Sequence, residues 1–337
     1  MKKKIYYFDN FKNIKVNSNG YWLRAFEEYG DVRIFDINRM KNRLTGFFEK
    51  ARVKKDMLSF APDCIHFGGS AKTPRKMPPD FVKWARETFP EARITFFYGD
   101  GYNIEEYYNS IENYVDAFFM TNMSFVKDSR YNFLVCPVPA ELEREWNPVK
   151  ENNLVFIGNN YNRDRFSAVS FLREKFGMKV YGNDWPPEFG AYHVYYDKDY
   201  ADVCSNSWIV MADPAGPLCR NSDGDKCVAV ERTGTYSKGV CRDKNCNRYS
   251  EMAAYLSNRT ANTMLACAVH LVPYVKEIEN HFENWKDIVW YKSDQERDEI
   301  IEHLLSNPEK CREIAVGAAL KARNFTFEKA AARVIGI

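Results

Sequence analysis

The chain has 337 residues, of which 45% are hydrophobic and 28% charged, and this is ample for a large core and for two domains. No apolar run approaches the roughly 20 residues of a membrane-spanning helix, and the basic start is not followed by the long apolar segment of a signal peptide. These features exclude a membrane-spanning protein and predict a soluble, cytoplasmic one. Nine cysteines, several of them inside apolar runs, predict reduced thiols rather than a disulfide framework.

The net charge of +2 conceals an uneven distribution. Residues 1–55 contain fourteen Lys and Arg but only six Asp and Glu, so this segment is basic and the remainder of the chain is acidic. Two interpretations stay open, a solvated helix face and a surface that attracts a polyanion.

Short apolar segments predict six strands in the first part of the chain, at residues 4–8, 32–37, 64–67, 93–97, 115–120 and 133–136. Apolar residues at helical spacing predict helices at 21–29 and 39–58. The residues predicted to form their apolar faces are Trp22, Ala25 and Phe26 in the first helix and Met40, Leu44, Phe47, Phe48 and Ala51 in the second. Three prolines between residues 137 and 148 then indicate a linker, which we place at 139–152.

Two loops that follow these strands carry candidate ligand-binding or catalytic residues. Gly68 and Gly69 allow a ligand to approach the backbone after the third strand. His66, near the end of that strand, is either a general base or, as is commoner for a single histidine at a strand end, a structural residue. Asp100 follows the fourth strand between two glycines, a pattern that by itself indicates a turn.

The second half of the chain alternates between strand and helix patterns. The predicted strands are residues 154–157, 179–181, 208–212, 269–273 and 287–291, and the predicted helices are 166–176, 258–268, 276–282, 295–305, 308–323 and 325–335. This alternation is typical of a parallel sheet covered by helices on both faces. We therefore expect the chemistry at the strand ends.

A glycine-led loop from Gly158 to Arg165 precedes the helix at 166–176. The amino end of a helix attracts phosphate, and Arg163 and Arg165 add positive charge there. This loop is the predicted phosphate site.

Residues 213–251 form a polar, glycine-rich insertion without a sustained period. Its four cysteines are Cys219, Cys227, Cys241 and Cys246. A segment too polar to build a core can gain folding energy from thiolate ligands on zinc, so the insertion is a candidate for a structural zinc site. Unligated thiols are the alternative, because neither pair has the close C-x2-C spacing.

The segment LACAVHLVPYVKEIENHFENWKDIVWY, followed by a helix and then by NPEKCREIAVGAALKARNFTFEKAA, resembles the C-terminal end of glycosyltransferases of the GT-B fold. It is most similar to the CgeB-like, spore-maturation branch, closely over the last quarter of the chain and more loosely before it. The resemblance implies an α/β protein with two Rossmann-like domains that face each other across a cleft. An acceptor domain would span residues 1–138 and a nucleotide-sugar domain, with the cysteine-containing insertion, residues 153–337. In GT-B proteins the last helix often crosses back to the first domain.

The resemblance also implies roles for particular residues. Asp100 corresponds to the aspartate of a "Y/W-x-D" loop and would be the catalytic residue, with His66 as a second candidate. The predicted donor-binding residues are Gly158, Arg163, Arg165, Tyr181, Gly182, Trp185, Asn262 and Thr263. The predicted acceptor-binding residues are Gly68, Gly69, Tyr98 and Tyr102.

One position departs from the family pattern. Alignment on Leu265-Ala266-Cys267 places Thr263 where the family usually has a Glu that holds the donor ribose. A hydroxyl can bond the ribose but lacks the strength of a charged carboxylate. The alternative is that Asn262 and Thr263 are polar residues of an exposed helix turn.

The sequence thus predicts transfer of a sugar from a nucleotide sugar, with UDP or GDP as the nucleotide, to an acceptor hydroxyl without a catalytic metal. An inverting transfer would need Asp100 to accept the proton, whereas a retaining one would not. The basic N-terminal segment, together with a second basic segment from Arg220 to Arg248, favours a hydroxylated base in DNA as the acceptor, ahead of a glycan, lipid or protein. A catalytically weak GT-B scaffold that binds a polyanionic partner is the alternative of another class, and the oligomeric state stays open.

Overall fold

The computed structural model describes residues 2–11, 18–40, 43–68, 77–98, 105–121, 126, 128–160, 163–194, 198–212, 219–220, 240–241, 256–257, 259–275 and 277–337. The chain divides into two compact units. The first comprises Met1–Leu134 with Phe327–Ile337, and the second comprises Val135–Thr326. Among the helices of the described residues, none is long and apolar enough to cross a membrane.

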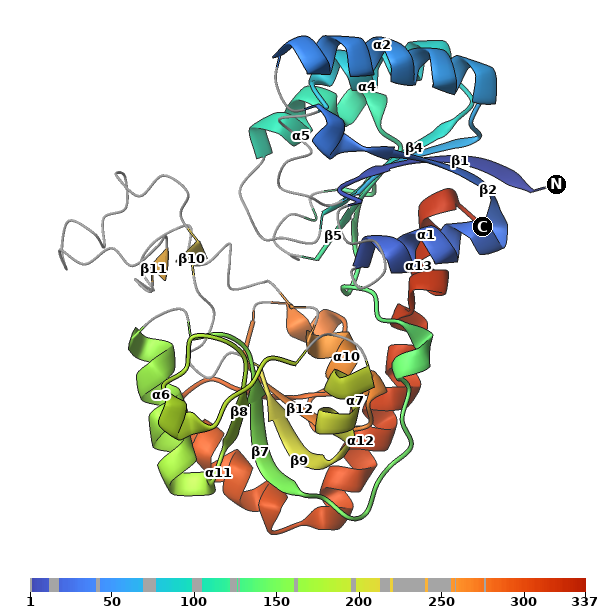
Figure 1. Ribbon diagram of the computed structural model, residues 1–337. Helices are drawn as coiled ribbons and strands as arrows, with labels where there is room; N and C mark the ends of the chain where they lie inside the picture. Colours follow the sequence, from blue (N-terminus) through green and yellow to red (C-terminus); the bar gives the residue numbers. More distant parts are fainter. Residues whose placement is uncertain are drawn as a thin grey trace. The chain divides into compact units, whose positions relative to one another are not determined.

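The first unit is built on a six-stranded sheet in the order β2-β1-β3-β4-β5-β6, in which every neighbouring pair is parallel (Figure 1). The strands are β1 (Lys3–Asp9), β2 (Gly30–Asp36), β3 (Cys64–Phe67), β4 (Arg93–Tyr98), β5 (Ala117–Met120) and β6 (Tyr131–Phe133). Strands β3 and β5 are buried at every residue, as expected for a parallel sheet covered on both faces.

Helices cover both faces of this sheet. One face packs against α1 (Ser18–Tyr29) and the C-terminal helix α13 (Phe327–Ile335), where the rings of Tyr21 and Phe327 stack at 5.3 Å. The other face packs against α2 (Arg43–Phe60), α4 (Pro79–Thr88) and α5 (Glu105–Ile111). The end of the chain therefore completes the core of the first unit.

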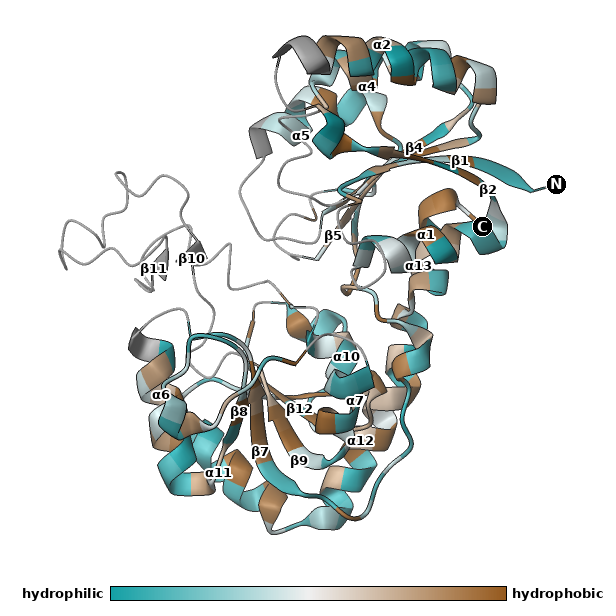
Figure 2. Ribbon diagram, viewed as in Figure 1, coloured by the Kyte–Doolittle hydropathy of each residue, from teal (hydrophilic) through white to brown (hydrophobic). Residues whose placement is uncertain are grey.

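The second unit is built on a five-stranded parallel sheet in the order β13-β12-β9-β7-β8. Its strands are β7 (Asn152–Ile157), β8 (Lys179–Tyr181), β9 (Ser207–Met211), β12 (Val269–Pro273) and β13 (Val289–Tyr291). Its helices are α6 (Arg163–Phe176), α7 (Lys198–Ser205), α10 (Arg259–Leu265), α11 (Asp294–Leu305) and α12 (Pro308–Ala322). Figure 2 shows the hydrophobic strands β7, β9 and β12 between helices that carry hydrophilic residues. The short strands β10 (Cys219–Arg220) and β11 (Val240–Cys241) pair antiparallel apart from both sheets.

A strand occurs at each of the eleven predicted places, although β6 overlaps the predicted 133–136 only at Phe133, and this confirms the α/β class. The predicted apolar face of α2 is wrong, because Phe47 and Phe48 are 69% and 63% exposed while Val53 and Met57 are buried. The helix predicted at 276–282 is also wrong. A 3-10 turn (Ile278–Asn280) occurs there instead, and it follows Glu277, whose positive φ of 70° interrupts a right-handed helix.

Candidate functional site

The strand order of each sheet marks one place where a ligand can bind. In the first unit, β2 and β3, which follow β1 in the chain, lie on opposite sides of β1. In the second unit, β8 and β9, which follow β7, lie on opposite sides of β7. At such a reversal the loops after two neighbouring strands diverge, and the crevice between them is the usual ligand site of parallel α/β sheets. The carboxyl ends of β7 and β1 are therefore the candidate sites of the two units.

The loop after β7 is held by the loop after β8. The backbone N–H of Gly158 donates to the carbonyl of Tyr181 at 2.7 Å, and the indole N–H of Trp185 donates to the carbonyl of Gly158 at 2.8 Å. Gly182 has a φ of 138°, and a Cβ there would lie 2.4 Å from the oxygen of Gly158. Glycine is therefore required at 182 both for its backbone conformation and for this close approach. The predicted donor-binding residues Gly158, Gly182 and Trp185 thus lie together.

Two arginines lie at the carboxyl end of β7. Arg165 on α6 donates to the carbonyl of Asn159 at 2.6 Å, and Arg259 on α10 donates through Nε to the carbonyl of Ile157 at 2.7 Å. Both guanidinium groups lie over the ring of Phe156, at 5.6 and 5.8 Å from its centroid. The site therefore combines positive charge with the start of α6, a combination that suits a phosphate group.

Arg259 was missed by the sequence reasoning. It lies at the start of α10, four residues before Thr263, and it contacts a residue 102 positions earlier. An arginine at the start of a helix that leads into a buried strand was the available signal. For Arg163 the structure describes the backbone alone, as the first residue of α6.

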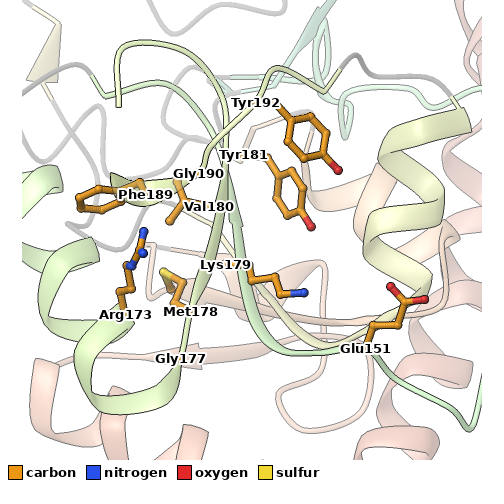
Figure 3. A pocket seen from close by; sticks show the side chains of 10 residues that line it. All are labelled: Glu151, Arg173, Gly177, Met178, Lys179, Val180, Tyr181, Phe189, Gly190 and Tyr192. Carbon is orange, nitrogen blue, oxygen red and sulfur yellow. The ribbon is translucent and has the colours of Figure 1, made fainter. Parts of the chain in front are cut away.

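The side chain of Tyr181 lines a cavity of about 560 Å³ along strand β8 (Figure 3). Its ring contacts that of Tyr192 at 5.1 Å, nearly perpendicular, and burial raises the pKa of Tyr181 to about 12. Lys179, Glu151 and Arg173 lie around the same cavity. Tyr181 therefore supports the glycine loop with its backbone carbonyl, while its side chain belongs to the cavity.

Asn262 and Thr263 are buried in α10, with 3% and 0% exposure. The hydroxyl of Thr263 lies 3.1 Å from that of Tyr200, within the core. This burial corrects the expectation of an exposed helix turn, and it favours packing over the predicted ribose contact for Thr263.

His66 in the first unit lies wholly inside the core. Its Nδ1 is 2.8 Å from the hydroxyl of Thr95, and the rings of Tyr7, Trp22 and Phe26 surround it at 5.2 to 5.5 Å. Burial lowers the pKa of His66 to about 3, so the imidazole is neutral at physiological pH. The surroundings support the structural interpretation of His66 rather than the catalytic one.

The predicted acceptor residues are only partly described. Tyr98 is 3% exposed and packs edge-on against Tyr108 at 5.7 Å, so its ring belongs to the core. Gly68 follows β3 directly, and its N–H donates to the carbonyl of Phe8 on β1 at 2.7 Å. Asp100, Gly69 and Tyr102 lie outside the described residues, and their roles stay predictions.

A carboxylate that the sequence reasoning did not consider lies at the end of β1. Asp9 is 3% exposed and occupies the last position of the strand, next to Gly68. The available signal in the sequence was an acidic residue directly after the apolar residues 4–8 of the predicted first strand. Of the residues predicted for this unit, His66, Gly68 and Tyr98 are described, and all three are buried.

The cysteine insertion is described at two short strands. Cys219 of β10 and Cys241 of β11 are direct partners in their antiparallel pair, while Cys227 and Cys246 lie outside the described residues. Within the described part of the chain, no group of three or more His, Cys, Asp or Glu could hold a metal ion. The five cysteines described with their side chains are free thiols.

The profile of a family described as "Glycosyl transferase-like" matches residues 163–335, more than half of the chain. The chain belongs to this glycosyl transferase-like family. The match begins at the first residue of α6 and therefore includes Arg165, Trp185 and Arg259. No curated protein matches the chain in sequence.

Solved structures share the architecture of this glycosyltransferase. The sucrose-phosphate synthase of Thermosynechococcus elongatus has a TM-score of 0.63 at 9% identity, over 98% of this chain and 97% of that chain. A glycosyltransferase of Rickettsia africae ESF-5 has a TM-score of 0.63 at 9% identity, over 99% of both chains. Anabaena HepE in complex with UDP and glucose has a TM-score of 0.61 at 10% identity, again over 99% of both. The protein is thus a glycosyltransferase of the GT-B fold, whereas its substrates are not given by the fold.

Proposed function

We propose that this glycosyltransferase takes its sugar from a nucleotide-sugar donor, whose diphosphate binds at the carboxyl end of β7. The observation that carries the proposal is the convergence of Arg165 and Arg259 on the backbone on either side of Gly158, at Asn159 and Ile157, close to the start of α6. Departure of a nucleoside diphosphate leaves negative charge, which fixed guanidinium groups and a helix amino end stabilise without a metal. The sugar would pass to an acceptor hydroxyl.

A uridine nucleotide is our first choice of donor. HepE, which shares the fold, has been solved with UDP and glucose and with UDP-glucose, and this supports the choice. A GDP sugar is the second choice. Assignment to the CgeB-like branch, with an acceptor domain at residues 1–138 and a donor domain at 153–337, rests on the sequence resemblance and is part of the proposal.

The test is a thermal-shift panel of UDP, GDP, ADP and dTDP sugars on the full chain. We expect one nucleotide class to raise the melting temperature, and the shift to disappear in Arg259→Ala. Arg173→Ala is the matched control, because Arg173 lies on the last turn of α6, where it bonds the carbonyl of Glu188. If no donor in the panel stabilised the wild-type protein, the scaffold alternative would replace the enzymatic one.

For the acceptor we propose a hydroxylated base in DNA, ahead of a glycan, lipid or protein. The basic segment at residues 1–55 supports this choice. Some of its charge is engaged, since Arg33 pairs with Asp56 at 2.6 Å and Lys54 lies over the ring of Trp84 at 4.5 Å. A flipped base costs a few kcal/mol to extrude and needs a pocket to receive it.

Phosphate contacts would make duplex binding fall steeply with salt, with a log-log slope near minus the number of phosphates engaged. The measurement is a salt titration of duplex binding, with sugar transfer compared on hydroxymethylated and plain DNA. If duplex binding does not change with salt concentration and no labelled sugar is transferred to the hydroxymethylated duplex, DNA is excluded as the acceptor and the other acceptor classes stay.

A further inference from the structure

Phe156 lies against both arginines at the carboxyl end of β7. It is the last residue but one of that strand and is wholly buried. The guanidinium groups of Arg165 and Arg259 lie over its ring, at 5.6 and 5.8 Å from the centroid. The two arginines belong to different helices, α6 and α10. The ring of Phe156 is therefore a contact that these two cationic side chains share.

The orientation of this ring is fixed by its neighbours. Trp185 meets the ring of Phe156 edge-on, at 6.1 Å and 84°. The indole of Trp185 is in turn bonded to the carbonyl of Gly158 at 2.8 Å. Phe156 also belongs to the buried cluster that contains Leu154 and Ile209. Because side chains in such a close-packed core hold one arrangement, the ring presents a fixed face to the arginines.

The missing side chain at Gly158 lets the ring and Arg259 approach each other. A Cβ at this position would lie 2.7 Å from Cζ of Phe156 and 2.9 Å from Nη2 of Arg259. Any side chain at 158 would therefore displace the tip of the ring or the guanidinium group. The guanidinium thus lies directly against the backbone of Gly158, while its Nε donates to the carbonyl of Ile157 at 2.7 Å.

A shared aromatic ring counters the repulsion between two like charges. Two guanidinium groups repel each other, whereas the negative face of an aromatic ring attracts each of them. This attraction is stronger away from water, and Arg165 is only 3% exposed. A diphosphate carries charge on two phosphate groups, so a pair of cations held in advance binds it better than a single one.

We propose that Phe156 is the positioning residue of the donor site, whose ring holds Arg165 and Arg259 together as one group that selects a diphosphate over a monophosphate. The inference rests on the proposed function, because it concerns the arginines assigned there to the donor diphosphate. Phe156 is wholly buried and acts through the arginines rather than on the donor itself. A weaker ring face would leave both charges present but less well placed, so diphosphate affinity should fall more than monophosphate affinity.

The experiment weakens the ring face while it keeps the packing. A difluorinated phenylalanine, incorporated at position 156 of the full chain, keeps the shape of the ring but withdraws negative charge from its face. Titration calorimetry measures binding of UDP and UMP, with GDP and GMP as the second pair. We expect diphosphate affinity to fall about threefold to tenfold and monophosphate affinity to change by less than about twofold. A residue that only fills the core would not respond in this way, so an unchanged ratio of the two affinities overturns the proposal.

Phe156→Leu is the second variant and removes the ring altogether. We expect it to lower diphosphate affinity by about tenfold and to reduce the preference for diphosphate over monophosphate. Phe176→Leu is the matched control, because Phe176 ends α6, packs against the same core and has Lys175 over its ring at 4.8 Å. The control should keep the wild-type preference, and an equal loss in both variants overturns the proposal.

The wild-type protein separates this inference from the proposed function. If it binds none of the four nucleotides, the proposed function fails and the role of Phe156 fails with it. If it prefers a diphosphate and both Phe156 variants keep that preference, the donor site stands and the positioning role alone is overturned.

Discussion

The indole N–H of Trp185 donates a hydrogen bond of 2.8 Å to the carbonyl oxygen of Gly158, and so joins the loop after β8 to the loop after β7. Trp185 also stacks on Phe189 at 5.3 Å, which fixes the plane of the indole. The loop that precedes α6 is therefore held from outside by a residue 27 positions later. Its position, and that of the arginines bonded to it, depends on this contact.

Replacement of Trp185 by Phe should test that dependence. Phe keeps the aromatic stacking but removes the N–H donor, so we expect the free energy of unfolding to fall by about 1 kcal/mol. Donor affinity should weaken as the Gly158 loop relaxes, and calorimetry with the preferred nucleotide sugar measures this. Trp290→Phe, a change on β13, is the control that should leave donor affinity intact. Equal donor affinity in both variants would show that the Trp185 contact is not needed to shape the site.

The two arginines at the end of β7 should respond differently to replacement. Arg165 is 3% exposed and bonds the carbonyl of Asn159, so Arg165→Ala should lower the free energy of unfolding by about 2 kcal/mol as well as activity. Arg259 is only partly buried, so Arg259→Lys should keep the fold and charge but lose the Nε bond to Ile157. We expect kcat/KM to fall about tenfold to 100-fold, which corresponds to about 1.4 to 2.7 kcal/mol.

The double replacement of Arg163 and Arg165 by Ala should remove most turnover. Urea unfolding monitored by fluorescence would separate lost stability from lost chemistry, since the burial of Arg165 predicts a contribution from both. Near-normal activity of the double variant would show that the donor diphosphate does not bind at this loop.

Asp9 should make stability depend on pH in a direction opposite to that of a salt-bridged aspartate. Burial raises its pKa to about 6 in the folded protein, so the folded state binds the proton more tightly than the unfolded state. The stabilisation is then complete below the unfolded pKa of about 4 and is lost as the pH rises through 6. Asp9→Asn should therefore be more stable than wild type at pH 8 by about 3 kcal/mol, with the difference vanishing near pH 4. Chemical unfolding at both pH values measures this. A variant that is less stable at pH 8 would show that the carboxylate serves mainly to anchor the end of β1.

The four cysteines of the insertion should bind about one zinc per chain if all are ligands. Mass-spectrometric metal analysis of protein purified without chelator measures the content, and Cys219→Ser with Cys241→Ser should abolish it. Cys136→Ser, at a half-buried thiol outside the insertion, is the control that should retain the metal. Protein without metal, whose four thiols titrate freely in the native state, would dismiss the zinc site.

Much of the site could be located from sequence because strand-end loops are local features. Gly158 was identified by its position after a predicted strand, and Gly182 and Trp185 by the family resemblance, and the structure brings the three together. Arg259 and Asp9 were missed because their significance depends on partners distant in sequence. His66 was recognised, but only its surrounding rings decide between a base and a core residue.

The sequence by itself determined the strands and the α/β class, because apolar runs of three to six residues can be recognised from the local sequence alone. The segments 64–67, 179–181 and 269–273 have the same bounds in the structure as in the pattern. Only the tertiary structure decided the order of the strands in each sheet, because hydrogen bonding between parallel strands joins segments that are far apart in the chain. That order placed Asp9 against Gly68 and Arg259 against Ile157, and so assembled the two candidate sites.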